Sequence, residues 1–137
     1  MNEFENKVFL GGTCNDSTWR EELIPMLEMG FFNPVVPNWN EEAYKKELLA
    51  RGQCAYVLYV LTPDMTGVYS VAEVVDDSNK QPEKTLFCVL PEGKDGKAFD
   101  EHQMKSMVSV GKMVVQNGGA WFTDLEDTAR FLNANQP

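Results

Sequence analysis

Short apolar runs alternate with longer segments in which apolar residues recur every three or four positions. Two of the short runs, CAYVLYVLT and TLFCVL, are apolar on both faces, as is typical of central strands in a parallel sheet. The predicted strands cover residues 7–12, 31–36, 54–62, 85–90 and 120–122. The predicted helices cover residues 16–30, 41–52, 68–79, 101–117 and 123–132.

This alternation of strands and helices predicts an α/β fold, an open five-stranded parallel sheet with helices on both faces. The length of 137 residues is that of one domain, so a single domain over 1–137 is expected. Ligands of such sheets bind outside the carboxyl ends of the strands. The loops GGTCND after the first strand and TPDMTG after the third are therefore the places to look for a site.

Two residues set helix boundaries in this pattern. Pro25 should kink or break the predicted first helix, because proline lacks a backbone donor and collides with the preceding turn. Asn40 can cap the helix that follows it, since its side chain can accept a hydrogen bond from a free N–H group of the first turn.

The charge of the chain narrows its partners. With 12 basic and 21 acidic residues the net charge is −9, which disfavours nucleic-acid polymers and anionic membranes. The net charge does not exclude a local basic pocket that binds one phosphate. The three cysteines show no C-x-x-C spacing, no signal peptide pattern is present and no apolar run reaches 18 residues. We expect a soluble cytoplasmic protein without disulfides or a zinc site.

Missing motifs exclude several reaction classes. The single histidine, His102, lies in a polar stretch, so a Ser-His-Asp hydrolase or a histidine-rich metal site is disfavoured, and no P-loop is present. Gly11, Gly12 and Thr13 lack the spacing of a dinucleotide fingerprint. Their backbone amides could still bind an anion or sugar hydroxyls at a helix N-terminus.

Glu73 is the sharpest catalytic candidate. It follows a central strand and stands in the first turns of a predicted helix, whose dipole would lower its pKa and keep it ionised. Carboxylate nucleophiles displace groups at anomeric carbons. The alternative is structural, because Ser70-Val-Ala-Glu73 matches the S/T-x-x-E capping box. The chain has two further matches, at Thr18–Glu21 and Thr123–Glu126.

Four segments together resemble the nucleoside 2-deoxyribosyltransferase-like superfamily, nearest to its small phage and bacterial branch. They are KVFLGGTCNDSTWREELIPML, FFNPVVPNWNEEAYKKE, YVLTPDMTGVYSVAE and VGKMVVQNGGAWFTDLEDTARFL. The resemblance implies a flavodoxin-like sheet. It also implies cleavage of the N-glycosidic bond of a 2′-deoxynucleoside or its 5′-monophosphate. The sugar would pass to another base or to water, with Glu73 as the matching nucleophile.

The same resemblance implies roles for other residues and shows departures. Glu47 is the nearest match to a carboxylate that contacts base or sugar. Gly67 stands where an acidic or serine residue is usual, and Asp64 could substitute if its loop folds inward. Phe9 replaces a tyrosine that orients the nucleophile, and Tyr69 could supply that hydroxyl one helical turn from Glu73.

The residues expected to contact substrate come from several loops. Asn38 and Trp39 could read and stack on a base, although Trp39 could equally be a hydrophobic cover. Arg20 could hold a phosphate or be a solvated helix residue. The full set of expected substrate-binding residues is Phe9, Gly11, Gly12, Thr13, Asn38, Trp39, Glu47, Gly67 and Ser70.

Three functions remain open from the sequence, and the third is a structural partner protein. The first is a deoxyribosyltransferase or N-glycosidase that uses Glu73, with Asp64 or Glu47 handling the proton of the leaving base, and without a metal or redox cofactor. The second is a catalytically inactive module that binds or senses a nucleotide. The resemblance also implies a homodimer or a larger homo-oligomer, because a C-terminal segment often completes a neighbour's site in that family.

Overall fold

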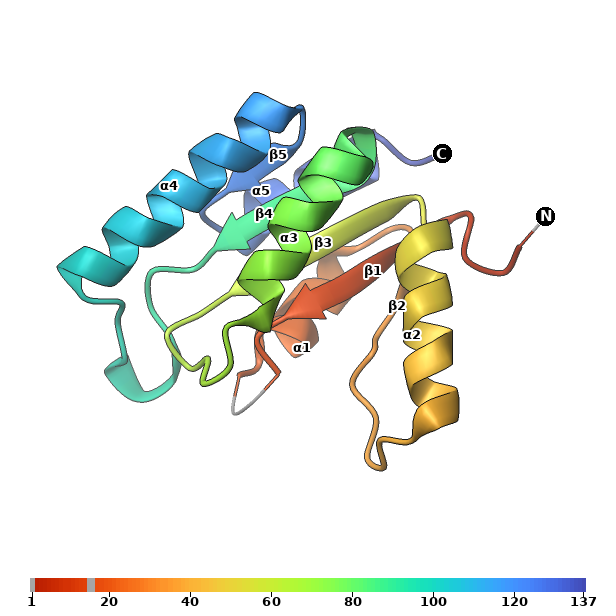
Figure 1. Cartoon of the computed structure of the whole chain (residues 1–137), viewed down its shortest axis with the longest axis horizontal. Helices are drawn as coiled ribbons and strands as arrows, with labels where there is room; N and C mark the ends of the chain where they lie inside the picture. The colour runs from red at the N-terminus through yellow and green to blue at the C-terminus, as the bar shows by residue number, and fades with distance from the viewer. Residues whose placement is uncertain (1, 15–16) are drawn as a thin grey trace.

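The computed structural model describes residues 2–14 and 17–137. Its strands are all parallel and lie in the order β2-β1-β3-β4-β5, so the predicted flavodoxin-like α/β fold is confirmed (Figure 1). The strands are β1 (Lys7–Gly12), β2 (Gly30–Phe32), β3 (Tyr56–Leu61), β4 (Thr85–Val89) and β5 (Ala120–Phe122). The helices are α1 (Trp19–Leu23), α2 (Glu41–Gln53), α3 (Tyr69–Lys80), α4 (Glu101–Asn117) and α5 (Leu125–Ala134).

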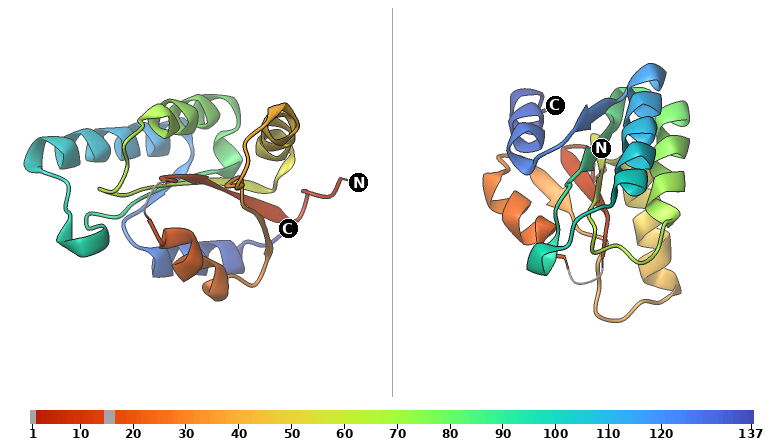
Figure 2. Two further views of the ribbon diagram at one scale, coloured as in Figure 1. Left: turned by 90° about the horizontal axis from the view of Figure 1, so that it is seen from below. Right: turned by 90° about the vertical axis from the view of Figure 1, so that its left-hand side faces the viewer.

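The helices cover both faces of the sheet, as the apolar pattern predicts. Helices α2, α3 and α4 lie on one face, and α1 and α5 lie on the other (Figure 2). The central strand β3 sends Tyr59 and Leu61 into the first layer, and Leu58 and Val60 into the second. All four side chains are buried, which explains why this strand is apolar at every position.

The first helix and the second strand are shorter than predicted. Instead of one helix over 16–30, α1 ends at Leu23 and runs into a 3₁₀ turn over Ile24–Met26, where Pro25 occupies the first turn. Asp16, where the helix was expected to begin, lies outside the described residues. The strand expected over 31–36 is only Gly30–Phe32, at the edge of the sheet. Pro34 follows two residues later and has no backbone N–H group for further pairing.

None of the three S/T-x-x-E matches forms a capping box. Val68 is the N-cap of α3, so Ser70 already lies inside that helix, and no side chain caps this end. Thr18 precedes α1 without a capping hydrogen bond, and Asp124 rather than Thr123 caps α5. A capping box is present instead on α4, between Asp100 and Gln103.

Helix α2 begins where Asn40 predicts, with the Asn40 side chain accepting a hydrogen bond from the Ala43 N–H at 2.8 Å. Its buried residue is Ala50, so apolar packing holds α2 to the sheet at few points. Within residues 2–14 and 17–137, no helix combines the length and apolar character needed to cross a membrane.

Candidate active site

The topological switch point of the sheet lies between the carboxyl ends of β1 and β3. From β1 the chain goes to β2 on one side and afterwards to β3 on the other. Thr13 ties the two ends together. Its N–H donates to the Val60 carbonyl at 2.9 Å, and its hydroxyl oxygen accepts from the Thr62 N–H at 3.0 Å.

Gly11 and Gly12 are required by close packing at this junction. A Cβ on Gly11 would lie 2.8 Å from the ring of Tyr59. At Gly12 the backbone has φ of +115°, and a Cβ would lie 2.0 Å from the Val60 carbonyl oxygen. These glycines bring β1 and β3 close together, and Gly12 also lines a cavity described below.

Arg20 is neither solvated nor open to a phosphate. It is 8% exposed, and its guanidinium donates to the Leu10 carbonyl at 3.0 and 3.1 Å and to the Thr13 carbonyl at 2.7 Å. The guanidinium therefore fixes the loop after β1 from the α1 side, which corrects both roles considered for it from the sequence.

Two cavities meet beside this junction and share the side chains of Tyr69 and Glu73. The loop cavity has a volume of about 280 Å³ and is lined by Gly12, Thr13, Cys14, Leu61, Met65, Thr66, Gly67, Tyr69, Ser70 and Glu73. The aromatic cavity has a volume of about 210 Å³ and is lined by Trp39, Tyr44, Glu47, Leu48, Arg51, Tyr69 and Glu73. Both lie on the face of the sheet that α2 and α3 cover.

Glu73 stands at the meeting point of the two cavities, in the second turn of α3. Its side chain is 16% exposed, and its Oε2 lies 3.6 Å from a terminal nitrogen of Arg51. Burial raises the pKa of Glu73, the Arg51 charge opposes that rise, and Glu47 and Asp77 add to it. The lowered pKa expected for Glu73 is therefore wrong, because burial outweighs the favourable charge of Arg51. Glu73 also lies beyond the first turn of α3, which begins at Tyr69.

The aromatic cavity combines exposed rings with a second carboxyl group. Trp39 and Tyr44 are 57% and 50% exposed, and their ring centres lie 6.0 Å apart in an edge-to-face arrangement. Burial raises the pKa of Glu47, against the opposing charges of Arg51 and Arg20. Flat aromatic surfaces beside a carboxyl group suit a planar heterocycle that carries hydrogen-bonding groups.

Arg51 is held by residues that the sequence does not reveal as part of a site. Its Nε and one terminal nitrogen donate to the two oxygens of Asp77 at 2.9 and 3.1 Å. The Tyr59 hydroxyl donates to the same carboxylate at 2.5 Å. The available signals are weak. They are the i, i+4 spacing of Glu73 and Asp77, and a tyrosine in a strand whose neighbours are all apolar.

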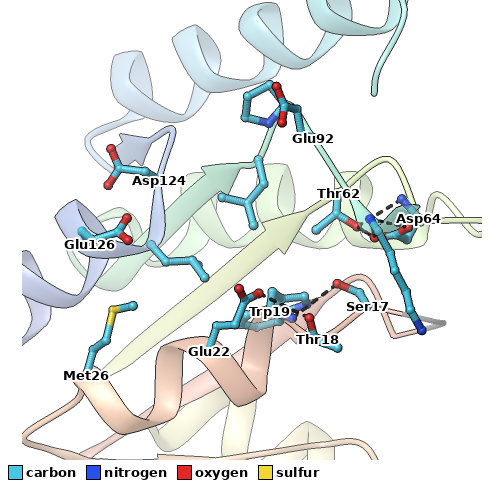
Figure 3. A pocket seen from close by; sticks show the side chains of 15 residues that line it. Ser17, Thr18, Trp19, Glu22, Met26, Thr62, Asp64, Glu92, Asp124 and Glu126 are labelled. Carbon is cyan, nitrogen blue, oxygen red and sulfur yellow. Dashed lines mark hydrogen bonds between the residues drawn. The ribbon is translucent and has the colours of Figure 1, made fainter. Parts of the chain in front are cut away.

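Asp64 is not brought together with Glu73. It is 5% exposed, accepts from the Lys94 N–H at 3.1 and 3.2 Å, and accepts from the Thr62 hydroxyl at 3.2 Å. Asp64 thereby anchors the loop after β4. It lines a separate cavity of about 500 Å³, the acidic cavity, around which Glu22, Glu92, Asp124 and Glu126 also stand (Figure 3).

The acidic cavity offers carboxylates but no assembled metal site. Asp124 caps α5, where its side chain accepts from the Asp127 N–H at 2.7 Å, and Glu22 accepts from the Thr18 hydroxyl at 3.4 Å. Among the described residues, no group of three or more histidine, cysteine or acidic side chains is arranged to hold a metal ion.

The remaining predicted site residues divide into two groups. Gly67 and Ser70 line the loop cavity, and their substrate-binding role stays a prediction. Phe9 lies in the core, where its ring stacks on Phe32 at 5.9 Å between ring centres, and it lines neither cavity. Asn38 is exposed on the loop before α2 and also lines neither cavity.

The chain was compared with models of protein families and with curated proteins. A family model described as "Nucleoside 2-deoxyribosyltransferase like" matches residues 5–92, a range that includes every residue lining the loop and aromatic cavities. Among curated proteins no significant match is found.

Proposed function

The chain belongs to the nucleoside 2-deoxyribosyltransferase-like family, and we propose that it breaks the N-glycosidic bond of a 2′-deoxynucleoside or its 5′-monophosphate. The observation that carries this proposal is the position of Glu73 where the loop and aromatic cavities meet. A carboxylate there can reach a sugar whose base lies in one cavity and whose 5′ end lies in the other.

In the first step a Glu73 oxygen attacks C1′ of the deoxyribose. A bond forms between this oxygen and C1′, the bond from C1′ to the base nitrogen breaks, and its electron pair leaves with the base. In the second step a nitrogen of another base, or a water oxygen, attacks C1′ and gives its proton to the carboxylate that protonated the leaving base, and Glu73 departs as a carboxylate. The reaction requires neither a metal nor a redox cofactor.

Glu47 is proposed to protonate the leaving base. It lines the same cavity as Trp39 and Tyr44, against which the base would stack, and burial raises its pKa, the direction that suits a general acid. The pKa of Glu73 is raised as well, but the ion pair with Arg51 favours its ionised form. Asp64, the other candidate for this proton transfer, hydrogen-bonds the loop after β4 and lines the acidic cavity. We therefore assign no catalytic role to Asp64.

The pocket for the 5′ end of the sugar is proposed to be the loop cavity. Ser70 offers a hydroxyl group there, and a Cβ on Gly67 would have no atom within 4 Å, so the mouth of the cavity is open. The amino end of α3 has no side-chain cap, which leaves backbone N–H groups for a sugar hydroxyl or a phosphate.

The test is incubation of the protein with each of the four deoxynucleosides and their 5′-monophosphates, with and without a free acceptor base. Release or exchange of base is followed by chromatography. Wild-type turnover that disappears in Glu73→Gln but persists in Glu42→Gln, an exposed glutamate on α2, supports the proposal. Turnover that survives in Glu73→Gln contradicts the glycosyl-glutamate route. Dependence on the acceptor separates a transferase from a hydrolase.

A nucleotide-binding module without chemistry is the second candidate. The observation that favours it is the lack of a hydroxyl on Phe9, together with the engagement of the Tyr59 hydroxyl by Asp77. In this case nucleotides raise the melting temperature of the protein while no substrate is turned over. Any base release that depends on Glu73 rules this candidate out.

The proposal includes self-association into a homodimer or larger homo-oligomer. An exposed apolar groove between α3 and α4, lined by Val68, Val71, Ala72, Val75, Val110 and Met113, supports it. The groove adjoins Tyr69 at the mouth of the site, so a second copy seated there would also narrow the entrance. Sedimentation should show an oligomer that Val68→Asp weakens. A wild-type monomer at all concentrations contradicts this part of the proposal.

A further inference from the structure

Arg51 lies between the Asp77 carboxylate on its core side and the Glu73 carboxylate on its cavity side, and it is held more closely by Asp77. Toward the core it forms a bidentate hydrogen-bonded pair with Asp77, at 2.9 and 3.1 Å. Toward the cavities its remaining terminal nitrogen faces Glu73 at 3.6 Å, an ion pair longer than a hydrogen bond. The guanidinium is planar, so the first pair fixes the direction in which the third nitrogen points.

The core side of this arrangement is buried and hydrogen-bonded. The Asp77 side chain is 6% exposed, and its Oδ2 accepts from both Arg51 and the Tyr59 hydroxyl. Tyr59 itself is fully buried in β3. Burial would lower the pKa of Arg51, but its hydrogen bonds to Asp77 and the nearby acidic groups outweigh burial and raise it. Arg51 therefore stays charged at any pH at which the protein is folded.

We propose that Arg51 is a positioning residue that orients the Glu73 nucleophile, and that Asp77 and Tyr59 hold Arg51 in place for this task. The nucleophilic role of Glu73 rests on the proposed function. With Oε2 facing Arg51, the other carboxylate oxygen is left to form the bond to C1′. Because three contacts beyond Glu73 restrain Arg51, it need not move when Glu73 is esterified.

The arrangement also fits the change of charge during the reaction. When Glu73 becomes an ester it loses its negative charge, but Asp77 still balances Arg51, so no buried cation is left without a partner. When the ester is broken, the Arg51 charge is already in place to stabilise the departing carboxylate. Asp76 adds a longer contact of 3.4 Å and is also paired with Lys80.

The test compares four full-length variants with wild type: Arg51→Met, Arg51→Lys, Tyr59→Phe and Asp76→Asn. Two measurements are made on each. One is kcat and KM for base release across pH, and the other is the titration of the Glu73 carboxyl carbon by NMR in protein without ligand, with Glu73→Gln used to assign its signal. The charged and titratable groups around Glu73 are Arg51 and Glu47 on α2, Asp77 on α3, Tyr59 on β3, and Tyr69 and Cys14 at the cavity.

Arg51→Met is expected to lower kcat by about 100-fold with little change in KM, because the nucleophile is no longer aligned. Its Glu73 carboxyl should titrate at higher pH, since the charge that opposes the burial effect is gone, and the acid limb of the rate should move the same way. Arg51→Lys keeps the charge and should leave both titrations near wild type. It should still lose about tenfold or more in kcat, since an ammonium group cannot span Asp77 and Glu73 as the guanidinium does.

Tyr59→Phe is expected to lower kcat but not KM, whereas Asp76→Asn should change kcat less than any Arg51 variant. A folded Arg51→Met protein with wild-type kcat and an unmoved Glu73 titration overturns the proposal. If Arg51→Met does not fold, wild-type kcat in both Arg51→Lys and Tyr59→Phe overturns it. Should wild type turn over no substrate, the proposed function fails, and the Glu73 titration alone then supports or overturns the pairing with Arg51.

Discussion

Removing the hydroxyl of Tyr59 tests how much its hydrogen bond to Asp77 contributes to the stability of the fold. The Tyr59→Phe change removes one donor from Asp77 and leaves the two hydrogen bonds from Arg51. A hydrogen bond to a charged group contributes about 1.5–3 kcal/mol, and the surviving Arg51 pair favours the lower part of that range. We expect the free energy of unfolding to fall by about 2 kcal/mol.

Tyr56 supplies a matched control on the same strand. Its hydroxyl donates to the carbonyl of Asn135 at 2.7 Å, near the surface, where water can replace it. The acceptor is uncharged, so Tyr56→Phe should lower the free energy of unfolding by less than about 1 kcal/mol. The two variants therefore make the same chemical change at a buried, charged acceptor and at an exposed, neutral one.

Urea denaturation followed by circular dichroism measures both values. Each 1 kcal/mol corresponds to about 3–5 °C in Tm for a chain of 137 residues, so Tyr59→Phe should lower Tm by about 6–10 °C. The slope of the urea transition should stay the same, because the surface exposed on unfolding is unchanged. Equal losses in Tyr59→Phe and Tyr56→Phe would refute the claim that Asp77 depends on its tyrosine.

Three further predictions concern Glu73, Gly12 and Trp39. Burial raises the pKa of Glu73 in the folded protein above its ordinary value in the unfolded chain. The free energy of unfolding of wild type therefore falls as pH rises from the ordinary pKa through the raised one. Glu73→Gln has no carboxyl group to ionise and lacks this loss. The variant should thus be the more stable at pH 7 and equal to wild type below about pH 4, by urea denaturation, and a less stable variant at pH 7 contradicts the sign. Gly12→Ala should lower the free energy of unfolding by about 3 kcal/mol or more, since its φ is +115° and its Cβ would overlap Val60. Gly52→Ala, with no atom within 4 Å of the added Cβ, should instead raise that free energy by up to about 1 kcal/mol, and similar values for the two would disprove this account. Trp39→Ala should weaken nucleoside binding by about tenfold or more with little change in Tm, because the ring is 57% exposed and a lost base stack is worth about 1–3 kcal/mol; titration calorimetry showing wild-type affinity excludes Trp39 from the base site.

The architecture follows from the sequence because apolar runs report burial directly. CAYVLYVLT and TLFCVL became the central strands β3 and β4, each covered on both faces. The helix predicted over 101–117 has those bounds, since its apolar period is regular and Gly118 ends it in a left-handed conformation with φ of +111°. Helix beginnings were less predictable. The S-x-x-E pattern does not fix where a helix starts, and α3 begins one residue before Ser70.

The candidate site was predictable only in part, for a related reason. Glu73, Glu47 and Trp39 could be named because they follow strands or resemble a known pattern, and they line cavities that meet. Arg51 on α2 and Asp77 on α3 are joined by side-chain hydrogen bonds between two separate helices, which no local pattern encodes. The turn of Asp64 toward the loop after β4 is likewise a long-range contact, with the backbone of Lys94.

Helix α2 lines one side of the aromatic cavity and is sparsely buried, which should affect the hydrogen exchange of its backbone amides. Ala50 is its buried residue, so local opening of α2 exposes little apolar surface. It breaks the contacts of Arg51 with its acidic partners and the hydrogen bonds from Gln81 and Lys84 to the carboxyl end of α2. Amide hydrogens of α2 should therefore exchange with solvent well before those of β3 and β4. A nucleoside bound between Trp39 and Glu73 would bridge α2 to α3, and slower exchange along α2 would then report occupancy without any chemistry taking place.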